Sequence, residues 1–351
     1  MNHSSIVHEL YGNQSSTGQH INLNRTTTSQ GIASMILNIY IGPILCAFGI
    51  CGNIMNLIVL FKGRLTDSPY LYLKTLALTD MFALTLSLVH MTISGKSTMY
   101  VWQFFNAYVF FPLANFFMAA SVWLTVGVTI DRFIYVKAPL FARGYCSRKR
   151  ARVRIILILC FTLLVSVPRF YCYTVNGNGD IFSLTKSSFR ASITYYRIYN
   201  ITCIVIIHVA PLLILMFCNV YLICALRNAK STREELHIRN NREKDWQRDQ
   251  RRFTITLISI VLVSIIAIVP STIVDFVQFF KTSFNTYRKL RLSSNLLLLC
   301  NLSMNFLLYC AFNKRFVRAM KTIFCKDKVR FTSMKRSRSP NSTINTYAVD
   351  N

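Results

Sequence analysis

The stretch Ser121–Val136, SVWLTVGVTIDRFIYV, decides the fold, because an uncharged run ends there in an acid, a base and an aromatic residue. The uncharged run extends over residues 97–130 and stops at Asp131-Arg132-Phe133. A charged side chain within a bilayer core costs about 3 kcal/mol on insertion scales. The adjacent acid and base are therefore either a pair that neutralises itself at the water boundary or a functional element.

The hydropathy pattern predicts seven membrane-spanning helices in a chain that is 53% hydrophobic. About 20 apolar residues cross the roughly 30 Å of hydrocarbon as a helix. Five uncharged windows reach that length, namely Thr26–Phe61, Ser97–Ile130, Ile198–Leu226, Phe253–Val274 and Leu292–Asn313. Tyr70–Ser94 and the short window Ile155–Pro168, whose flanking arginines can snorkel to the interfaces, complete the set. The predicted fold class is an all-α seven-transmembrane helix bundle.

The distribution of basic residues predicts the orientation. With the N-terminus outside, the inner segments hold 29 Lys and Arg residues and the outer segments ten, an asymmetry that follows the positive-inside rule. The net charge of +27 then fits an anionic membrane leaflet and a partner protein, so no nucleic acid is expected. We expect a multi-pass plasma-membrane protein with a cytoplasmic C-terminus.

The segments outside the spans have their own signatures. Residues 1–33 form a polar extracellular tail with three glycosylation sequons at Asn2, Asn13 and Asn24. Residues 313–325 alternate apolar and basic side chains, which predicts a short amphipathic eighth helix on the membrane surface, with Cys325 as a palmitoylation site. Residues 326–351 are polar and rich in Ser and Thr, so this cytoplasmic tail is expected to be disordered.

The order of the polar and proline residues along the spans resembles the rhodopsin-like (class A) G-protein-coupled receptors. The resemblance covers about residues 34–325, of which 34–312 would be the transmembrane domain. It rests on these residues, in chain order: Asn53, Asp80, Asp131-Arg132-Phe133, Pro211, Pro270, Asn305 and Tyr309. It implies a receptor for an extracellular ligand that activates a heterotrimeric G protein, with arrestin and a receptor kinase as further partners, and not an enzyme.

The resemblance assigns roles to single residues. Asp131 would restrain Arg132 at rest, and Arg132 would face the G protein in the active state. The other residues implied in coupling and activation are Phe133, Asn219, Asn305 and Tyr309. Asp80, with Ser121, Asn301 and Asn305, would hold an allosteric sodium ion, for which hard oxygen ligands are suited; no other cofactor is expected.

Three further elements are similar to invertebrate receptors for FMRFamide-type neuropeptides. They are Pro168-Arg169-Phe170, Asn219 eight residues after Pro211, and Asn305-Phe306-Leu-Leu-Tyr309. This similarity implies a short amidated peptide as the ligand. Because a charge in a low-dielectric cleft must be paired, Asp275 is the candidate partner of a cationic ligand group; capping, or pairing with a local base such as Lys281, is the alternative. Ala114, Phe117 and Met118 are expected to line the ligand site.

Several departures from the receptor pattern keep a second interpretation open. Ala107 stands where the family has a disulfide cysteine, and Ala267 to Val269 precede Pro270 where the family has a switch Trp. A bridge between Cys172 and Cys203 is conceivable. The inner end of the sixth span has Gln250 where an acid is usual, which predicts a weak resting state. The alternative is therefore a divergent chemosensory or small-molecule G-protein-coupled receptor; a transporter would show internal repeats.

Overall fold

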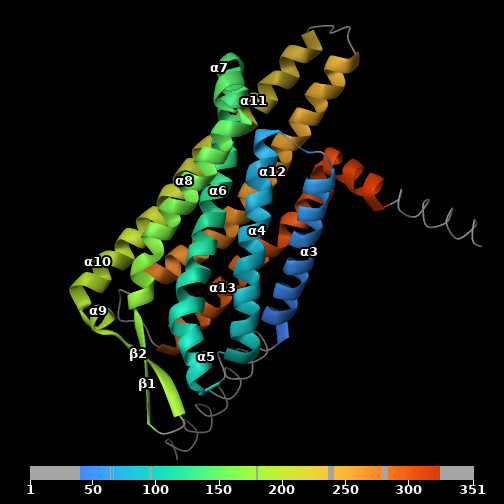
Figure 1. Ribbon diagram of the computed structural model, residues 1–351. Helices are drawn as coiled ribbons and strands as arrows, with labels where there is room; N and C mark the ends of the chain where they lie inside the picture. Colours follow the sequence, from blue (N-terminus) through green and yellow to red (C-terminus); the bar gives the residue numbers. More distant parts are fainter. Residues whose placement is uncertain are drawn as a thin grey trace, which may run out of the picture.

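The computed structural model describes residues 40–63, 65, 67–94, 97–178, 181–235, 241–277 and 284–324. Seven of its helical segments are long and apolar enough to cross a membrane, and they stand together as a bundle (Figure 1). The predicted seven-helix fold class is confirmed. The sequons at Asn2, Asn13 and Asn24, the modification site Cys325 and the tail 326–351 lie outside the described residues and stay predictions.

The spans are continuous helices; the second, third and fifth contain a π-helical turn, and the fourth ends in a 3₁₀ turn. The first three are α3 (Gly42–Lys62), α4 (Ser68–Val89) with η2 (His90–Ser94), and α5 (Tyr100–Phe105) with η3 (Asn106–Phe110) and α6 (Phe111–Lys137). The next two are α8 (Arg148–Ser166) with η4 (Val167–Tyr171), and α10 (Ile193–Cys203) with η5 (Ile204–Val209) and α11 (Ala210–Glu235). The last two are α12 (Asn241–Val277) and α13 (Phe284–Phe312), and a short helix α7 (Pro139–Tyr145) links α6 to α8.

The fourth helix is longer than the 14-residue window that the sequence suggests. It begins at Arg148, where the hydroxyl of Ser147 accepts a hydrogen bond from the Arg150 amide, a regular helix N-cap. The basic residues 148–154 are therefore part of the helix and not of the preceding loop. The difference arises because hydropathy marks only the apolar part of a helix that starts in water.

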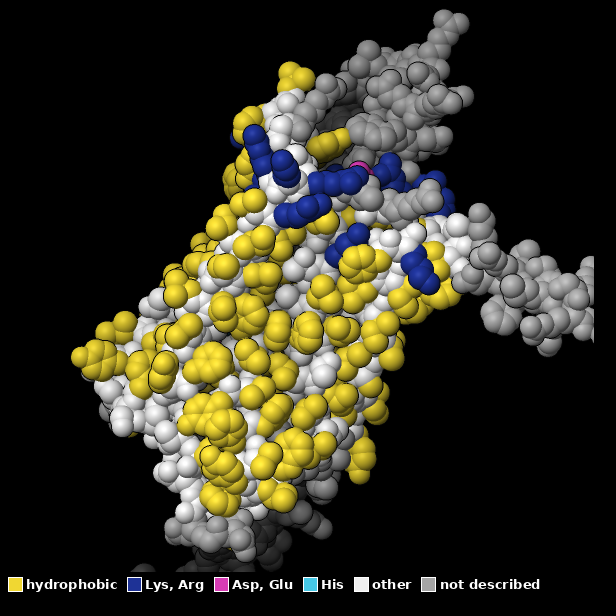
Figure 2. Space-filling model, viewed as in Figure 1, with side chains coloured by type: hydrophobic (Ala, Val, Ile, Leu, Met, Phe, Trp, Pro, Cys, Tyr) yellow, Lys and Arg dark blue, Asp and Glu magenta, His cyan; other side chains and the backbone are white. Residues whose placement is uncertain are grey.

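Large apolar side chains cover the outside of the bundle. Phe48, Leu164, Phe217 and Ile266 are between 46% and 72% exposed. Figure 2 shows hydrophobic side chains over most of one face, whereas Lys and Arg gather near the end that carries α7. An apolar exterior with a basic rim is the surface expected of a protein dissolved in lipid.

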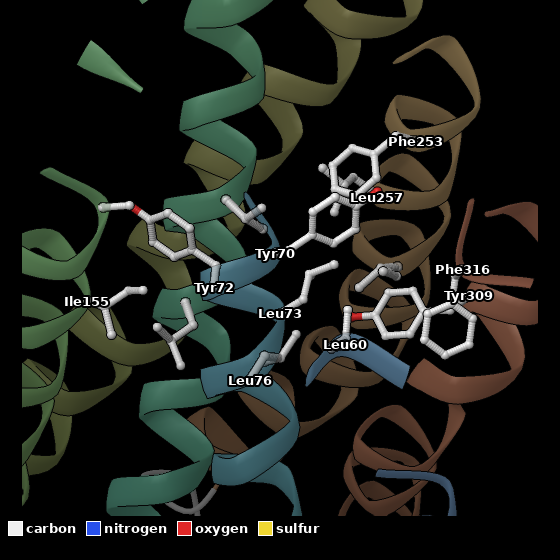
Figure 3. Packing of buried hydrophobic residues seen from close by; sticks show 14 of the residues in the cluster. Leu60, Tyr70, Tyr72, Leu73, Leu76, Ile155, Phe253, Leu257, Tyr309 and Phe316 are labelled. Carbon is white, nitrogen blue, oxygen red and sulfur yellow. The ribbon is translucent and has the colours of Figure 1, made fainter. Parts of the chain in front are cut away.

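The principal core lies in the half of the bundle nearest α7. It joins residues of α3, α4, α6, α8, α12 and α13, among them Leu60, Tyr70, Tyr72, Ile155, Phe253 and Tyr309, as Figure 3 shows. A second cluster, centred on Cys46, Leu84 and Leu302, packs α3, α4 and α13 nearer the other end. Close approach between helices depends on small residues: a Cβ added at Gly127 would lie 2.8 Å from the ring of Tyr72.

A two-stranded hairpin lies at the end of the bundle opposite α7 (Figure 1). Strands β1 (Tyr173–Asn178) and β2 (Ile181–Lys186) pair antiparallel, with Tyr173 opposite Lys186. The Phe182 amide donates to the Thr98 carbonyl at 2.9 Å, and the Tyr173 ring stacks on Phe111 at 4.9 Å. Since Ala107 replaces the usual cysteine, these noncovalent contacts hold the hairpin on the bundle.

An eighth helix follows α13 at residues 314–324, as predicted. Its start is fixed by Asn313, whose side-chain oxygen accepts a hydrogen bond from the Phe316 amide at 3.0 Å. Phe316 is buried against Tyr309, with ring centroids 5.5 Å apart. Lys314, Arg318 and Lys321 are exposed, so the helix buries one apolar face and presents bases on the other.

Candidate functional site

The hairpin end of the bundle contains one polar cluster that spans three helices. Asp275 of α12 accepts from Nη1 of Arg291 of α13 at 2.5 Å. Its other carboxylate oxygen lies 3.5 Å from Nε2 of His208 in η5. Asp275 and His208 are 18% and 19% exposed, whereas Arg291 is 46% exposed. We refer to these three residues as the outer cluster.

The outer cluster gives Asp275 a base as a partner. Arg291 is an ion-pair partner of Asp275 among the described residues, whereas Lys281, the base considered from the sequence, lies outside them. The ion pair ties α12 to α13 five residues beyond Pro270. His208 is largely buried, and its Nδ1 has no hydrogen-bond partner among the described residues. Asp275 is therefore a partly buried acid with a protein cation already on one of its two oxygens.

The three residues expected to line the ligand site from the third span lie deeper in the packing. Ala114 is 6% exposed. The ring of Phe117 stacks on Phe82 of α4 at 5.2 Å, and both Phe117 and Met118 pack against the cluster centred on Leu84 and Leu302. They are contacts between α6 and its neighbours in this structure, and their role toward a ligand stays a prediction.

A carboxylate lies buried in the middle of the bundle. Asp80 of α4 is 0% exposed, and its Oδ2 accepts from Nδ2 of Asn305 of α13 at 2.6 Å. Ser121 of α6 also interacts with this carboxylate, whereas Asp80 Oδ1 has no hydrogen-bond partner in the part of the chain that the structure describes. The fourth residue expected at this site, Asn301, accepts from Ser264 of α12 at 3.0 Å.

The Asp80 site fits a small hard cation. A buried carboxylate oxygen without a donor is costly unless a proton or cation compensates it. Asp80 Oδ1, the Ser121 hydroxyl and the side-chain oxygen of Asn305 are the groups that would hold sodium. Asn301 would contribute its side-chain oxygen if the hydrogen bond from Ser264 were broken. The ion would supply the positive charge that the carboxylate otherwise lacks.

Asn53 is a polar anchor between the first and seventh spans. Its side-chain amide donates to the Gly49 carbonyl at 2.9 Å and to the Leu302 carbonyl of α13 at 3.0 Å. The sequence argument that an Asn in an apolar helix needs a partner on a neighbouring helix is confirmed here. The nearby Gly52 is needed for close packing, since an added Cβ would lie 3.2 Å from Phe306.

At the α7 end, Asp131 is held by a residue that the sequence argument did not consider. Nη2 of Arg154 from α8 lies 3.0 Å from Asp131 Oδ1, and the Ser68 hydroxyl of α4 donates to Oδ2 at 3.0 Å. Arg154 also donates to the Tyr72 hydroxyl at 2.9 Å and to the Tyr145 carbonyl at 3.3 Å. The carboxylate thus links three helices.

The neighbouring Arg132 points into an aromatic environment and is 5% exposed. Its guanidinium lies 4.0 Å from the ring centroid of Phe253 on α12 and 5.5 Å from that of Tyr135. The structure gives this pair two contacts that the family resemblance did not name: Arg154 on the acid and Phe253 on the base.

The remaining residues expected in coupling surround this pair. The Phe133 ring packs edge-on against Tyr221 of α11 at 4.8 Å. Asn219 is buried and donates to the Leu215 carbonyl of its own helix at 2.8 Å. Tyr309 is 1% exposed and packs on Phe316. The structure thus assembles these side chains in one half of the bundle, but no contact in it tests coupling itself.

Sequence reasoning missed Arg154, Phe253, His208 and Arg291. Arg154 looked like a base at a helix end, and Phe253 like the first residue of an apolar window. A signal did exist for Arg291, because it directly precedes the seventh apolar window and Asp275 directly follows the sixth, so both lie at the same end of neighbouring spans. Cys172 and Cys203 are both buried and free, so the conceivable bridge between them is not formed.

The chain resembles known proteins over most of its length. The sequence model of the family described as "7 transmembrane receptor (rhodopsin family)" matches residues 52–309. The FMRFamide receptor of Drosophila melanogaster is 28% identical over 294 residues, which cover 79% of this chain and 52% of that protein. The Sex peptide receptor of the same fly is 27% identical over 279 residues, covering 72% and 62%.

A third relative comes from a nematode. The "Probable G-protein coupled receptor B0563.6" of Caenorhabditis elegans is 26% identical over 265 residues, which cover 70% of this chain and 60% of that protein. The chain therefore spans between half and two thirds of the length of these three relatives. The matched region contains the mid-bundle carboxylate, the Asp131–Arg154 pair and the outer cluster.

Proposed function

The chain belongs to the rhodopsin family of seven-transmembrane receptors, and we propose that it is a peptide receptor that activates a heterotrimeric G protein. The ligand class that we propose is a short amidated peptide of FMRFamide type. Two of the relatives are named for peptides, FMRFamide and sex peptide. Membership of this receptor family also agrees with the expectation that the chain is not an enzyme.

The outer cluster is the observation that carries the peptide proposal. Asp275 is the acid that the described residues offer at the hairpin end, and it is partly buried. An arginine in a peptide can form two parallel hydrogen bonds with a carboxylate. Because Asp275 is only 18% exposed, such a pair would be stronger here than in bulk water. A cationic peptide therefore has one defined anchor in this receptor.

Binding at Asp275 would be an exchange of partners. Arg291 already occupies Oδ1 at 2.5 Å, so a ligand guanidinium must take its place or share the carboxylate. Arg291 is 46% exposed, which makes its release into water inexpensive. The exchange would loosen the link between the outer ends of α12 and α13, and in this way ligand binding would shift the populations of helix packings.

We place the hairpin end of the bundle outside the cell and the α7 end inside. The basic residues gathered near α7 (Figure 2) support this orientation. The proposed protein is then a multi-pass plasma-membrane receptor with Arg132 on the side of the G protein. Arrestin and a receptor kinase would act on the Ser- and Thr-rich tail.

The proposal is tested by calcium and cyclic-AMP responses in cells that express the chain. The probes are a peptide ending in Arg-Phe-amide and the same peptide with citrulline in place of arginine. We expect Asp275→Asn to weaken the response to the arginine peptide about tenfold or more, and citrulline to do the same to the unaltered receptor. The citrulline peptide acting on Asp275→Asn should give a response little weaker than either change alone, because both changes remove the same ion pair.

Asp67→Asn is the matched control, because Asp67 lies at the opposite end and is 59% exposed. This variant should respond to the peptides as the unaltered receptor does. Surface expression is measured for every variant. No response to any peptide by a receptor that reaches the surface would reject the peptide proposal in favour of a chemosensory or small-molecule ligand.

A further inference from the structure

The guanidinium of Arg132 is buried at the boundary between α6 and α12. Its charge lies 4.0 Å from the ring centroid of Phe253, well within the distance of about 6 Å at which the face of an aromatic ring attracts a cation. Phe253 is 4% exposed. Such contacts are strongest when both partners are removed from water, as they are here.

The acid next to Arg132 is paired with a base on another helix. Asp131 accepts from Arg154 and from Ser68, each at 3.0 Å. Arg154 is itself positioned by Tyr72 and by the Tyr145 carbonyl. This arrangement links Asp131 to α4 and α8, which are not the helices that close over Arg132 from the other side. Across the α6–α12 boundary, the guanidinium of Arg132 contacts the ring of Phe253.

The ring of Phe253 is a rigid platform. It packs edge-on against Tyr70 of α4, with centroids 5.1 Å apart and planes at 67°, as Figure 3 shows. Tyr70 is 2% exposed and belongs to the principal core. Phe253 therefore cannot turn away from Arg132 without disturbing α4, and its ring moves only when α12 moves.

We propose that Phe253 is a positioning residue for coupling: its ring holds the Arg132 guanidinium and keeps α12 against α6 in the uncoupled receptor. When α12 moves outward, the ring leaves the cation, and the face of Arg132 that it covered becomes available to the partner on that side. The side chains of Asp249 and Gln250 lie outside the described ones. The role in coupling rests on the proposed function, whereas the contact between the helices does not.

The test varies the electron density on the face of the ring and leaves the shape of the ring nearly unchanged. Mono-, di- and trifluorinated phenylalanines are incorporated at position 253, and signalling without ligand is recorded per receptor at the cell surface. Fluorine withdraws electron density from the ring face, so the attraction for the cation weakens stepwise. We expect basal signalling to rise with each fluorine, to about tenfold for the trifluorinated ring, which corresponds to about 1.4 kcal/mol.

A packing role alone predicts a different result. If Phe253 acts only by filling space, the fluorinated series stays level, and Phe253→Leu alone raises basal signalling. A level series would overturn the proposal. Leu257→Ala is the control for packing, because Leu257 is 1% exposed in the same core and is one turn away on α12. In the Leu257→Ala receptor, the fluorinated rings at position 253 should still raise basal signalling step by step, because this change affects packing and not the charge on the ring face.

A second measurement separates failure of this inference from failure of the proposed function. Spin labels at Lys137 and Arg251, both exposed, report the distance between α6 and α12 in the purified receptor. Cys51, Cys160 and Cys224, which are exposed, are first changed to Ser. A wider distance in Phe253→Leu supports the contact as the restraint. An unchanged distance contradicts it, and a wider distance without any signalling contradicts the coupling function instead.

Discussion

Arg154 of α8 and Asp131 of α6 form an ion pair across two helices, with Nη2 3.0 Å from Oδ1. The acid is 2% exposed and the arginine 21%. A buried carboxylate without a partner is unfavourable, so the pair is a point at which α6, α8 and, through Ser68, α4 depend on each other. Arg154 is therefore a structural residue of the bundle as well as the ion-pair partner of a residue that we propose for coupling.

Arg154→Ala should lower the stability of the purified receptor. Removing one partner of a buried ion pair costs about 3–5 kcal/mol, and the partial exposure of Arg154 reduces the expected loss to about 2 kcal/mol. Thermal unfolding in detergent measures it. In an Asp131→Asn background the same change should cost much less. Arg152→Ala, on the exposed face of α8, should be close to neutral, and an equal loss at both positions would contradict the role of the pair.

Sodium should stabilise the receptor through Asp80. An ion that binds the folded state at ten times its dissociation constant contributes about 1.4 kcal/mol. We expect sodium chloride to raise the unfolding temperature above that in potassium chloride of equal ionic strength. Asp80→Asn should abolish the difference, because the oxygen without a donor is then part of a neutral amide. A difference between the salts that survives in Asp80→Asn would place the ion elsewhere.

Gly49 and Gly144 should respond differently to the same added methyl group. A Cβ at Gly49 would lie 2.7 Å from Cδ1 of Leu84, whereas at Gly144 the nearest atom is 3.9 Å away at the end of Arg150. Overpacking costs about 1–3 kcal/mol, so Gly49→Ala should be destabilising. Gly144→Ala should be neutral or stabilising, since Ala favours a helix. Thermal unfolding of the two variants decides between these outcomes.

The hairpin should loosen when its aromatic contacts are removed. The Tyr173 ring stacks on Phe111 and also receives Arg190, whose guanidinium lies 4.3 Å from its centroid. Tyr173→Ala should speed hydrogen exchange of the backbone amides in residues 173–186. Ile181→Ala is the control, because Ile181 is 67% exposed on the same hairpin. Equal protection in both variants would show that backbone bonds alone hold the hairpin.

Cys172 and Cys203 should both react with an alkylating reagent in the unfolded chain without prior reduction, since both are free. In the folded receptor, burial raises the pKa of the Cys172 thiol although Arg169 opposes this. The reactive thiolate is therefore scarcer at neutral pH than for an ordinary cysteine, and alkylation of Cys172 should be slow. Mass spectrometry of the labelled peptides measures both. A disulfide-linked peptide pair would contradict the prediction.

The number of spans could be predicted from the sequence because hydropathy is a local property. The need of Asn53 for a partner could also be predicted, since an amide in an apolar helix must bond to something. The identity of this partner, the Leu302 carbonyl, could not be predicted, because it depends on how α3 and α13 pack. The helix bounds at the ends of the spans, such as Arg148, were missed since charged residues continue a helix into water.

The site could be predicted only where a residue type is unusual for its place. Asp80, Asp131 and Asp275 stand out as acids in or near apolar segments. Their partners Arg154 and Arg291 lie on other helices, and Phe253 is one of 26 phenylalanines. Nothing in its spacing marks it as the ring beside Arg132. That contact is a product of tertiary packing.

The Arg132–Phe253 contact has a consequence for the chemistry of the compartment on that side of the membrane. A phenyl ring neither gains nor loses a proton at any pH at which a protein stays folded, whereas a carboxylate is protonated once the pH falls below its pKa of about 4. The attraction between α6 and α12 that we propose for this ring is therefore independent of pH over the whole range in which the arginine is charged. Acid conditions that would dissolve a restraint built from a carboxylate would leave this one in place.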